Sequence, residues 1–251
     1  MINDIIKIMK EAGNILLKEF DLNGREGFWN GTQYHAKADN LIHNFIKKEI
    51  ENLVPSYPVL SEEDISSKVL GKGEDFWILD PIDGTASYAE GYSGYVTQIA
   101  LIKSLKPVLS VIYAPKLDEL YCAELNEGSY KNNKKLKCNI SKNLTLIDNY
   151  PNPNGIAKKI IEDLNINKYI ECGSLGLKIC KIADNTANIF IKDVVVRDWD
   201  IAPPSLILSE ANGCLKKLNS DSFEYTGHSK HKGIIATSDK KLNNLVYSLL
   251  N

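Results

Sequence analysis

The sequence predicts a layered α/β or α+β fold. Amphipathic helical patterns occupy both ends of the chain and parts of its second half, and short apolar runs separated by turn residues fill the middle. With 251 residues, of which 43% are hydrophobic, the chain is long enough for one large core or two fused cores. The mixture of helices and strands implies that they pack in layers.

Two amphipathic helices are predicted near the N-terminus. The apolar face of the first consists of Ile5, Ile8, Met9, Ala12, Ile15, Leu16 and Phe20. A polar stretch at residues 21–31 is expected to be a loop. The second helix begins near Ala38 and Asp39, so a carboxylate lies at its positive end. Its apolar side consists of Leu41, Ile42, Phe45, Ile46 and Ile50.

Strands are predicted from short apolar runs that end at turn residues. They cover residues 58–60, 76–80, 96–102, 107–113 and 119–123. Because the last three are joined by short connections, they are expected to form an antiparallel meander.

The composition turns polar and rich in Asn and Pro around residues 137–154, which indicates a boundary between two lobes. We therefore predict an N-terminal α+β lobe at 1–145 and a C-terminal α/β lobe at 146–251. Helices are expected in the second lobe at 155–164, 175–185, 201–212 and over the last ten residues, and strands at 187–191 and 234–237. In the third of these helices, Pro203 and Pro204 fall in the first turn, where proline is tolerated.

Charge and cysteine content exclude several classes of protein. A formal net charge of −2 does not suit a general nucleic-acid binder. The 5 cysteines are scattered and form no C-x-x-C pair, so neither a zinc site nor a disulfide framework is indicated. Charged residues interrupt the first twenty positions at helical spacing, which is unlike a signal peptide, and no uncharged run approaches the length of a membrane span. We expect a cytoplasmic protein without membrane or nucleic-acid partners.

The most informative segment is Asp80-Pro-Ile-Asp-Gly-Thr85, which follows an apolar run. A buried strand can hold Asp80 rigidly, and Pro81 restricts the turn so that Asp80 and Asp83 face one point. The N–H groups that begin the next helix form an anion site beside these carboxylates. Together these groups can bind a divalent cation and a phosphate. The alternative for this segment alone is a turn with an N-cap, and a calcium loop fits its spacing less well.

Three further acidic segments lie at the ends of apolar elements. They are Asp39, Glu62-Glu63 and Asp198-Trp199-Asp200. Each alone is explained by a helix cap or a solvated loop, and Asp200 in particular is a natural N-cap for the helix that follows. Four such segments in one chain favour a shared site.

Three of these segments resemble, in order and spacing, the signatures of the inositol monophosphatase superfamily. They are Leu60-Ser-Glu-Glu63, Asp80-Pro-Ile-Asp-Gly-Thr85 and Trp199-Asp-Ile-Ala202. Gly173-Ser174 before a helix and Ser209-Glu-Ala-Asn-Gly213 support the resemblance, which extends from Asp39 to Gly213. It implies an α-β-α-β-α sandwich of the inositol monophosphatase/fructose-1,6-bisphosphatase type, and a magnesium-dependent phosphomonoesterase that is often inhibited by Li⁺.

The resemblance also implies roles for individual residues. The expected ligands of two or three Mg²⁺ ions are Glu62, Asp80, the carbonyl of Ile82, Asp83 and Asp200. Thr85 and Glu62 would orient the attacking water, with Asp39 as a further catalytic acid near the metals. The expected phosphate and substrate contacts are Gly84, Thr85, Ala86, Gly173, Ser174, Lys178, Lys192 and Asp193. The chemistry agrees, because a metal on oxygen ligands supplies a nucleophile and neutralises developing charge, whereas carboxylates alone would repel a phosphate.

The chain departs from the family pattern at a few positions. Ala36 stands where a threonine is common, Asn212 where glycine is usual, and Pro203-Pro204 where small residues such as alanine are common. None of these changes removes an expected metal ligand, so we expect activity to be retained.

The substrate is expected to be a small phosphorylated metabolite. The ungapped length of residues 85–102, the segment Tyr113-Ala-Pro115 and the helix start at Gly173 resemble bacterial 3'(2'),5'-bisphosphate nucleotidases, and Lys178 suits a second phosphate. Two positions differ from the pattern of the nucleotidases, because Ala86 replaces a basic residue and Lys192 matches an arginine only loosely.

Asp193 resembles the acidic residue that binds the ring in inositol phosphatases, so an inositol, sugar or histidinol phosphatase is the alternative. A regulatory binding protein that keeps a metal site is a third hypothesis, and the resemblance also implies a homodimer.

Overall fold

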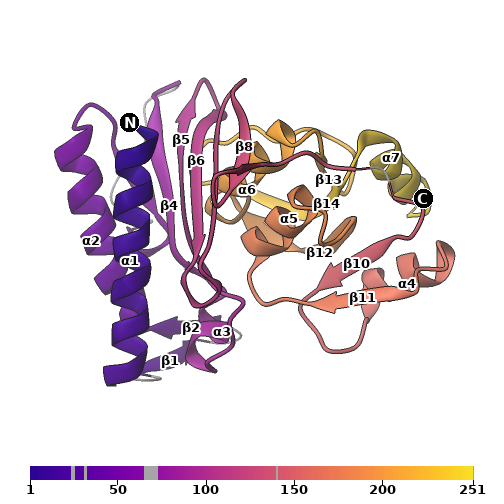
Figure 1. Ribbon diagram of the computed structural model, residues 1–251, viewed down its shortest axis with the longest axis horizontal. Coiled ribbons are helices and arrows are strands. Elements are labelled where there is room, and N and C mark those ends of the chain that lie inside the picture. Colours follow the sequence, from indigo (N-terminus) through magenta and orange to yellow (C-terminus); the bar gives the residue numbers. More distant parts are fainter. Residues whose placement is uncertain (24–25, 31–32, 65–72, 140, 251) are drawn as a thin grey trace.

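Five alternating layers of helices and sheets make up the fold in the computed structural model (Figure 1). The structure describes residues 1–23, 26–30, 33–64, 73–139 and 141–250. Within these ranges no helix is both long and apolar enough to cross a membrane. The α-β-α-β-α order confirms the layered fold predicted from the sequence.

Helices form the two outer layers and the middle layer (Figure 1). One outer layer consists of α1 (Ile2–Asn23) and α2 (Lys37–Leu53), the middle layer of α5 (Leu175–Ala183) and α6 (Asp198–Glu210), and the other outer layer of α4 (Gly155–Asp163) and α7 (Lys240–Ser248). The short helix α3 (Thr85–Ala89) directly follows the first sheet's strand β4 (Phe76–Asp83). Two 3-10 turns, η1 (Glu62–Asp64) and η2 (Pro115–Leu117), complete the helical elements of the described ranges.

The first sheet has seven strands in the order β3-β4-β5-β6-β7-β8-β9. Its other strands are β3 (Val59–Ser61), β5 (Val96–Lys103), β6 (Lys106–Ala114), β7 (Glu119–Glu124), β8 (Gly128–Lys131) and β9 (Lys134–Lys135). Strand β3 runs parallel to β4, and all other neighbours are antiparallel. The antiparallel meander expected over residues 96–123 is therefore confirmed as β5-β6-β7.

The second sheet is mixed, with five strands in the order β11-β10-β12-β14-β13. Its strands are β10 (Thr145–Asp148), β11 (Lys168–Glu171), β12 (Ile189–Arg197), β13 (Cys214–Lys217) and β14 (Lys230–Thr237). Strand β10 is parallel to β11 and β12, whereas β14 is antiparallel to β12 and β13. A separate hairpin pairs β1 (Gly27–Asn30) with β2 (Gln33–Ala36).

Alternation along the strands divides the interior into three apolar clusters. On β4, Trp77 and Leu79 pack toward α1 and α2, while Phe76 and Ile78 face the middle helical layer. On β12, Phe190 faces that middle layer and Ile191 faces the outer helices α4 and α7. Both sheets are thus covered on both faces, which is why strands β4, β5 and β10 consist almost entirely of buried residues.

Residues 145–148, within the polar segment at 137–154, form the buried strand β10. Two local expectations were wrong. Residues 27–30, in the polar stretch at 21–31 that was expected to be a loop, form strand β1, which pairs with β2. The helix expected from residue 201 begins at Asp198, which puts Pro203 and Pro204 in its interior instead of its first turn. The division into lobes at residues 145 and 146 stays a prediction.

Helix α1 crosses the first sheet at a glycine, and this contact predicts a stability effect. A Cβ atom at Gly13 would lie 2.5 Å from the ring of Tyr113 on β6. We expect Gly13→Val to lower the free energy of unfolding by about 2 kcal/mol or more because the helix must move away from the sheet. Urea unfolding measures this effect. Asn14→Val is the matched control, since Asn14 is exposed in the same helix, and an equal loss in both variants would contradict the explanation.

Candidate active site

Four of the acidic residues singled out in the sequence, Glu62, Asp80, Asp83 and Asp200, line one cavity of about 400 Å³. Its lining is Glu62, Asp80, Ile82, Asp83, Gly84, Thr85, Ala86, Ser87, Asn149, Tyr150, Gly173 and Asp200. We call it the acid cavity. These residues come from η1, β4, α3 and α6 and from the segments that follow β10 and β11, so the cavity forms only when the two sheets and the middle helical layer are packed together.

A β-bulge directs Asp80 and Asp83 to the same side of β4. Asp80 pairs with Gln98 and Asp83 pairs with Val96, so Pro81 and Ile82 together oppose the single residue between them on β5. Residues three apart on a regular strand point to opposite faces, and the extra residue cancels that difference. The sequence led us to expect a turn after Asp80. The strand instead continues to Asp83, and the bulge aligns the two carboxylates.

Asp83 binds the N-terminus of helix α5. Its Oδ2 accepts hydrogen bonds from the Ser174 hydroxyl at 2.7 Å and from the Gly176 N–H at 2.5 Å, and its Oδ1 accepts one from the Leu175 N–H at 3.1 Å. Ser174 also caps the helix by accepting from the Leu177 N–H at 2.9 Å. Ser174, expected to contact substrate, is buried and does not line the acid cavity.

Asp200 and Asp39 occupy equivalent positions on two other helices. Each is the third residue of its helix, and its carboxylate accepts a hydrogen bond from the backbone N–H three residues earlier, from Arg197 at 2.6 Å and from Ala36 at 2.8 Å. Asp200 is therefore not the N-cap residue expected from the sequence. Asp39 is buried and does not line the acid cavity, although its charge acts on Asp80.

The short helix α3 starts at a glycine that no other residue could replace without strain. Gly84 has φ of 91°, and a Cβ atom there would lie 3.3 Å from the Cα of Ser174. One residue on, the Thr85 hydroxyl donates to the carbonyl of Ile82 at 2.9 Å. That bond fixes the side chain of Thr85 and leaves its oxygen lone pairs available as acceptors.

The carboxylates of the acid cavity are held in an electrostatically unfavourable arrangement. Burial and then the neighbouring Glu62 and Asp83 raise the pKa of Asp80 well above its usual value. Burial likewise raises the pKa of Asp200, with Asp83 the next contribution. Burial and the charge of Glu63 raise the pKa of Asp39 to about 8. Burial also raises the pKa of Asp83, and the hydrogen bond from Ser174 opposes that shift.

These residues fit a hard divalent cation. Asp80 is 1% exposed, and its Oδ1 has no hydrogen-bond partner among the residues that the structure describes. Carboxylate and carbonyl oxygens are the ligands that Mg²⁺ prefers, and a cation would remove the repulsion that raises these pKa values. In the described part of the chain, no three acidic, histidine or cysteine side chains stand close enough to hold an ion as they are placed.

Gln98 was missed by the sequence analysis. Its buried amide nitrogen lies 3.4 Å from Asp80 Oδ2 and 3.5 Å from Asp83 Oδ2, and it also donates to the carbonyls of Trp199 at 3.1 Å and Asp200 at 3.3 Å. The signal that could have identified Gln98 in the sequence is its polar side chain within the apolar run of β5. Asn149 and Tyr150 were also missed, because the segment around them was interpreted as a boundary.

The amide of Gln98 compensates for the two prolines inside α6. In an α-helix the N–H of residue i donates to the carbonyl of residue i−4, so Pro203 and Pro204 leave the carbonyls of Trp199 and Asp200 without their helical donors. Those are the two carbonyls that Gln98 contacts. One side chain thus connects the carboxylates of β4 to the first turn of α6.

Three charged residues were expected to select the substrate, and none of them lines the acid cavity. They are Lys178, Lys192 and Asp193. Lys178 is buried, and its ammonium group donates to the carbonyls of Cys172 at 3.0 Å and Gly173 at 2.8 Å. Lys192 pairs with Asp148 at 2.8 Å and lies over the ring of Tyr150, 4.7 Å from its centre. Asp193 is exposed on β12. Lys178 and Lys192 are each linked to the cavity through a lining residue, Lys178 through Gly173 and Lys192 through Tyr150.

Comparisons with known proteins agree with this geometry. A family model described as "Inositol monophosphatase family" matches residues 1–251. The 3'(2'),5'-bisphosphate nucleotidase CysQ of Aggregatibacter actinomycetemcomitans is 27% identical over 234 residues, covering 90% of this chain and 87% of that protein. The Nus factor SuhB of Xylella fastidiosa is 27% identical over 225 residues, covering 84% of this chain and 80% of that protein.

Solved structures share the fold. The extragenic suppressor protein suhB of Bartonella henselae superposes with a TM-score of 0.83 at 23% identity, covering 99% of this chain and 97% of that chain. An inositol monophosphatase-II of Staphylococcus aureus gives 0.82 at 23% identity, covering 98% and 91%.

The double proline and Gln98 predict a coupled stability effect. Gln98→Met removes the donor and leaves buried carbonyls unpaired, so we expect a loss of about 2 kcal/mol in the free energy of unfolding. In a Pro203→Ala/Pro204→Ala background the alanine N–H groups can donate to those carbonyls, and the loss should be clearly smaller. Urea unfolding of the four proteins measures this coupling. Equal losses in both backgrounds would show that Gln98 does not compensate for the prolines.

The raised pKa values predict how stability depends on pH and metal. Folded Asp39 holds a proton up to about pH 8, whereas the unfolded chain releases it near its ordinary pKa of about 4. The unfolding free energy of the metal-free protein should therefore fall as pH rises from about 4 to about 8, by at most ~1.4 kcal/mol per pH unit for each such group. Mg²⁺, which binds carboxylates in their charged form, should stabilise the protein more at pH 8 than at pH 5. Urea unfolding measured in EDTA and in Mg²⁺ at several pH values tests the pH dependence and the effect of the metal. If Asp39→Asn left the slope of stability against pH unchanged, the contribution assigned to Asp39 would be wrong.

Proposed function

The chain belongs to the inositol monophosphatase family of metal-dependent phosphatases, and from that premise we propose that it is a magnesium-dependent 3'(2'),5'-bisphosphate nucleotidase. It would hydrolyse adenosine 3',5'-bisphosphate to AMP and phosphate. The observation that carries the proposal is the acid cavity, where a buried carboxylate oxygen of Asp80, which has no hydrogen-bond partner among the described residues, lies beside the start of α3. Relatives named as nucleotidases, 27% and 28% identical over 90% of this chain, support the substrate class.

In this proposal the acid cavity holds the metal ions and the reacting water. Glu62, Asp80, Asp83, Asp200 and the carbonyl of Ile82 are the proposed ligands. Bound Mg²⁺ would supply positive charge for the phosphate and lower the pKa of a coordinated water. Thr85 already donates its hydrogen to Ile82, so its oxygen can accept a hydrogen bond from a water and orient it together with Glu62.

The backbone next to the carboxylates is the proposed phosphate site. The N–H groups of Gly84, Thr85 and Ala86 begin helix α3 and border the cavity. Lys192 is proposed to contact the second phosphate of the substrate, for which it would exchange its ion pair with Asp148. Lys178, whose ammonium is buried against the carbonyls of Cys172 and Gly173, contributes by holding the loop at Gly173 in place.

Two other functions are supported by particular observations. The exposed Asp193 and the solved structures titled as inositol monophosphatases favour an inositol ester as substrate. The relative named Nus factor SuhB favours a regulatory role. A cytoplasmic location, a homodimer, two or three Mg²⁺ ions and inhibition by Li⁺ remain part of the proposal.

The proposal predicts magnesium-dependent phosphate release that disappears when Asp80 is changed. We expect Asp80→Asn to lower kcat/KM by about a thousandfold or more because one metal ligand loses its charge. The matched control is Asp163→Asn, which changes an exposed aspartate on α4. Asp83→Asn is less informative, since Asp83 also binds the N-terminus of α5. Phosphate release is measured with adenosine 3',5'-bisphosphate, inositol 1-phosphate, histidinol phosphate and fructose 1,6-bisphosphate.

The same assay separates the alternatives. A higher kcat/KM for inositol 1-phosphate than for the nucleotide would overturn the nucleotidase assignment while keeping the phosphatase. If wild type and Asp80→Asn were equally inactive on all four esters with Mg²⁺, a regulatory protein would be the better explanation.

A further inference from the structure

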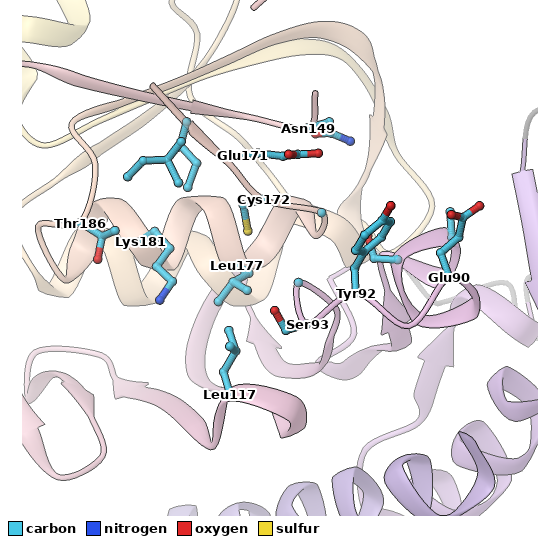
Figure 2. Close-up of a pocket in the computed structure, with 16 residues that line it drawn as sticks. Glu90, Tyr92, Ser93, Leu117, Asn149, Glu171, Cys172, Leu177, Lys181 and Thr186 are labelled. Carbon is cyan, nitrogen blue, oxygen red and sulfur yellow. The ribbon is translucent and has the colours of Figure 1, made fainter. Parts of the chain in front are cut away.

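A second cavity of about 400 Å³ adjoins the acid cavity, and nothing described so far uses it (Figure 2). The two cavities share four lining residues, which are Ala86, Ser87, Asn149 and Gly173. A molecule whose phosphate lies in the acid cavity can therefore extend across this shared edge. We call the second space the side cavity.

The walls of the side cavity are mainly apolar. Leu117 from η2, Ile147 from β10, Ile170 from β11 and Leu177 from α5 contribute to them. Figure 2 shows Leu117 and Leu177 pointing toward each other, with Tyr92 at the side of the same space. A volume of this size lies within the range of pockets that hold drug-sized molecules. Such walls favour a ring with apolar faces over a fully hydroxylated one.

The polar groups around the side cavity select against a second phosphate. Glu90 and Glu171 line it, and within the described residues neither forms an ion pair. The single lysine in the lining, Lys181, is held by Glu119 at 2.9 and 2.6 Å, so its charge is compensated. The cavity is therefore net negative. Its carboxylates and the amide of Asn149 can accept hydrogen bonds from amino and hydroxyl groups.

We propose that the side cavity binds the nucleoside part of the substrate's leaving group, a neutral ring system that carries an amino group, with the reacting phosphate in the acid cavity. This proposal rests on the proposed phosphatase function and assigns the recognition of the nucleoside to the residues of the side cavity. Any second phosphate lies outside the side cavity, on the side of Lys192.

The proposal is tested by filling the cavity from its exposed wall. Leu117 is 39% exposed, so Leu117→Trp can fill the space without opening the core, and Leu125→Trp is the control because Leu125 is 44% exposed and outside both cavities. We expect Leu117→Trp to raise KM for adenosine 3',5'-bisphosphate about tenfold. Its kcat/KM for glycerol 2-phosphate, which has no ring, should stay within about twofold.

Binding of AMP gives a second measurement that does not depend on turnover. Titration calorimetry should show weaker AMP binding by Leu117→Trp, and also by Glu171→Gln, which keeps the shape and removes the charge that accepts the amino group. An unchanged KM for the nucleotide, or an equal loss with both esters, overturns the proposal. If the wild type hydrolyses none of the esters, the phosphatase function is wrong. The side-cavity assignment is judged separately by AMP binding, and it is wrong as well if Leu117→Trp binds AMP as tightly as the wild type.

Discussion

The structure depends on burying several carboxylates beside one another without burying an equal number of cations. Three of them solve part of this problem in the same way, by accepting hydrogen bonds from the start of a helix. Asp39 does so on α2, Asp83 on α5 and Asp200 on α6. The positive ends of α5 and α6 therefore meet at the acid cavity, where they stabilise negative charge, and that of α2 holds Asp39, whose charge acts on Asp80. Asp80 has no such helix, and its Oδ1 is the oxygen without a partner among the described residues.

The layered fold explains why those helices point to one place. Helices α5 and α6 are packed between the two sheets by apolar side chains on both sides, among them Ile78 of β4 and Phe190 of β12. Both helices begin at the same edge of this middle layer, next to the bulge of β4. Displacing α6 would move Asp200 away from the other carboxylates of the acid cavity, and displacing α5 would move its N–H groups away from Asp83. The packing that forms the core therefore also holds the site together.

Local departures from regular structure are concentrated at the site. The bulge at Pro81 and Ile82 turns two aspartates to one side of the sheet. The double proline in α6 removes two helical hydrogen bonds, and Gln98 supplies donors from the neighbouring strand. The sequence showed both prolines, but their compensation depends on a residue about a hundred positions earlier in the chain. No local pattern connects the two.

The sequence by itself determined the chemistry and much of the fold. The Asp80-to-Thr85 motif, Glu62 and Asp200 were recognised because their segments resemble the family signatures in order and spacing, and the mixture of apolar strands with amphipathic helices predicted the layers. Only the tertiary structure decided where α6 begins, that Lys178 is buried against backbone carbonyls, and that Gln98 and the side cavity belong beside the carboxylates. The physical reason is that motifs and periodicity report the local chain, whereas burial, charge compensation and cavity shape arise from residues that meet only when the layers pack.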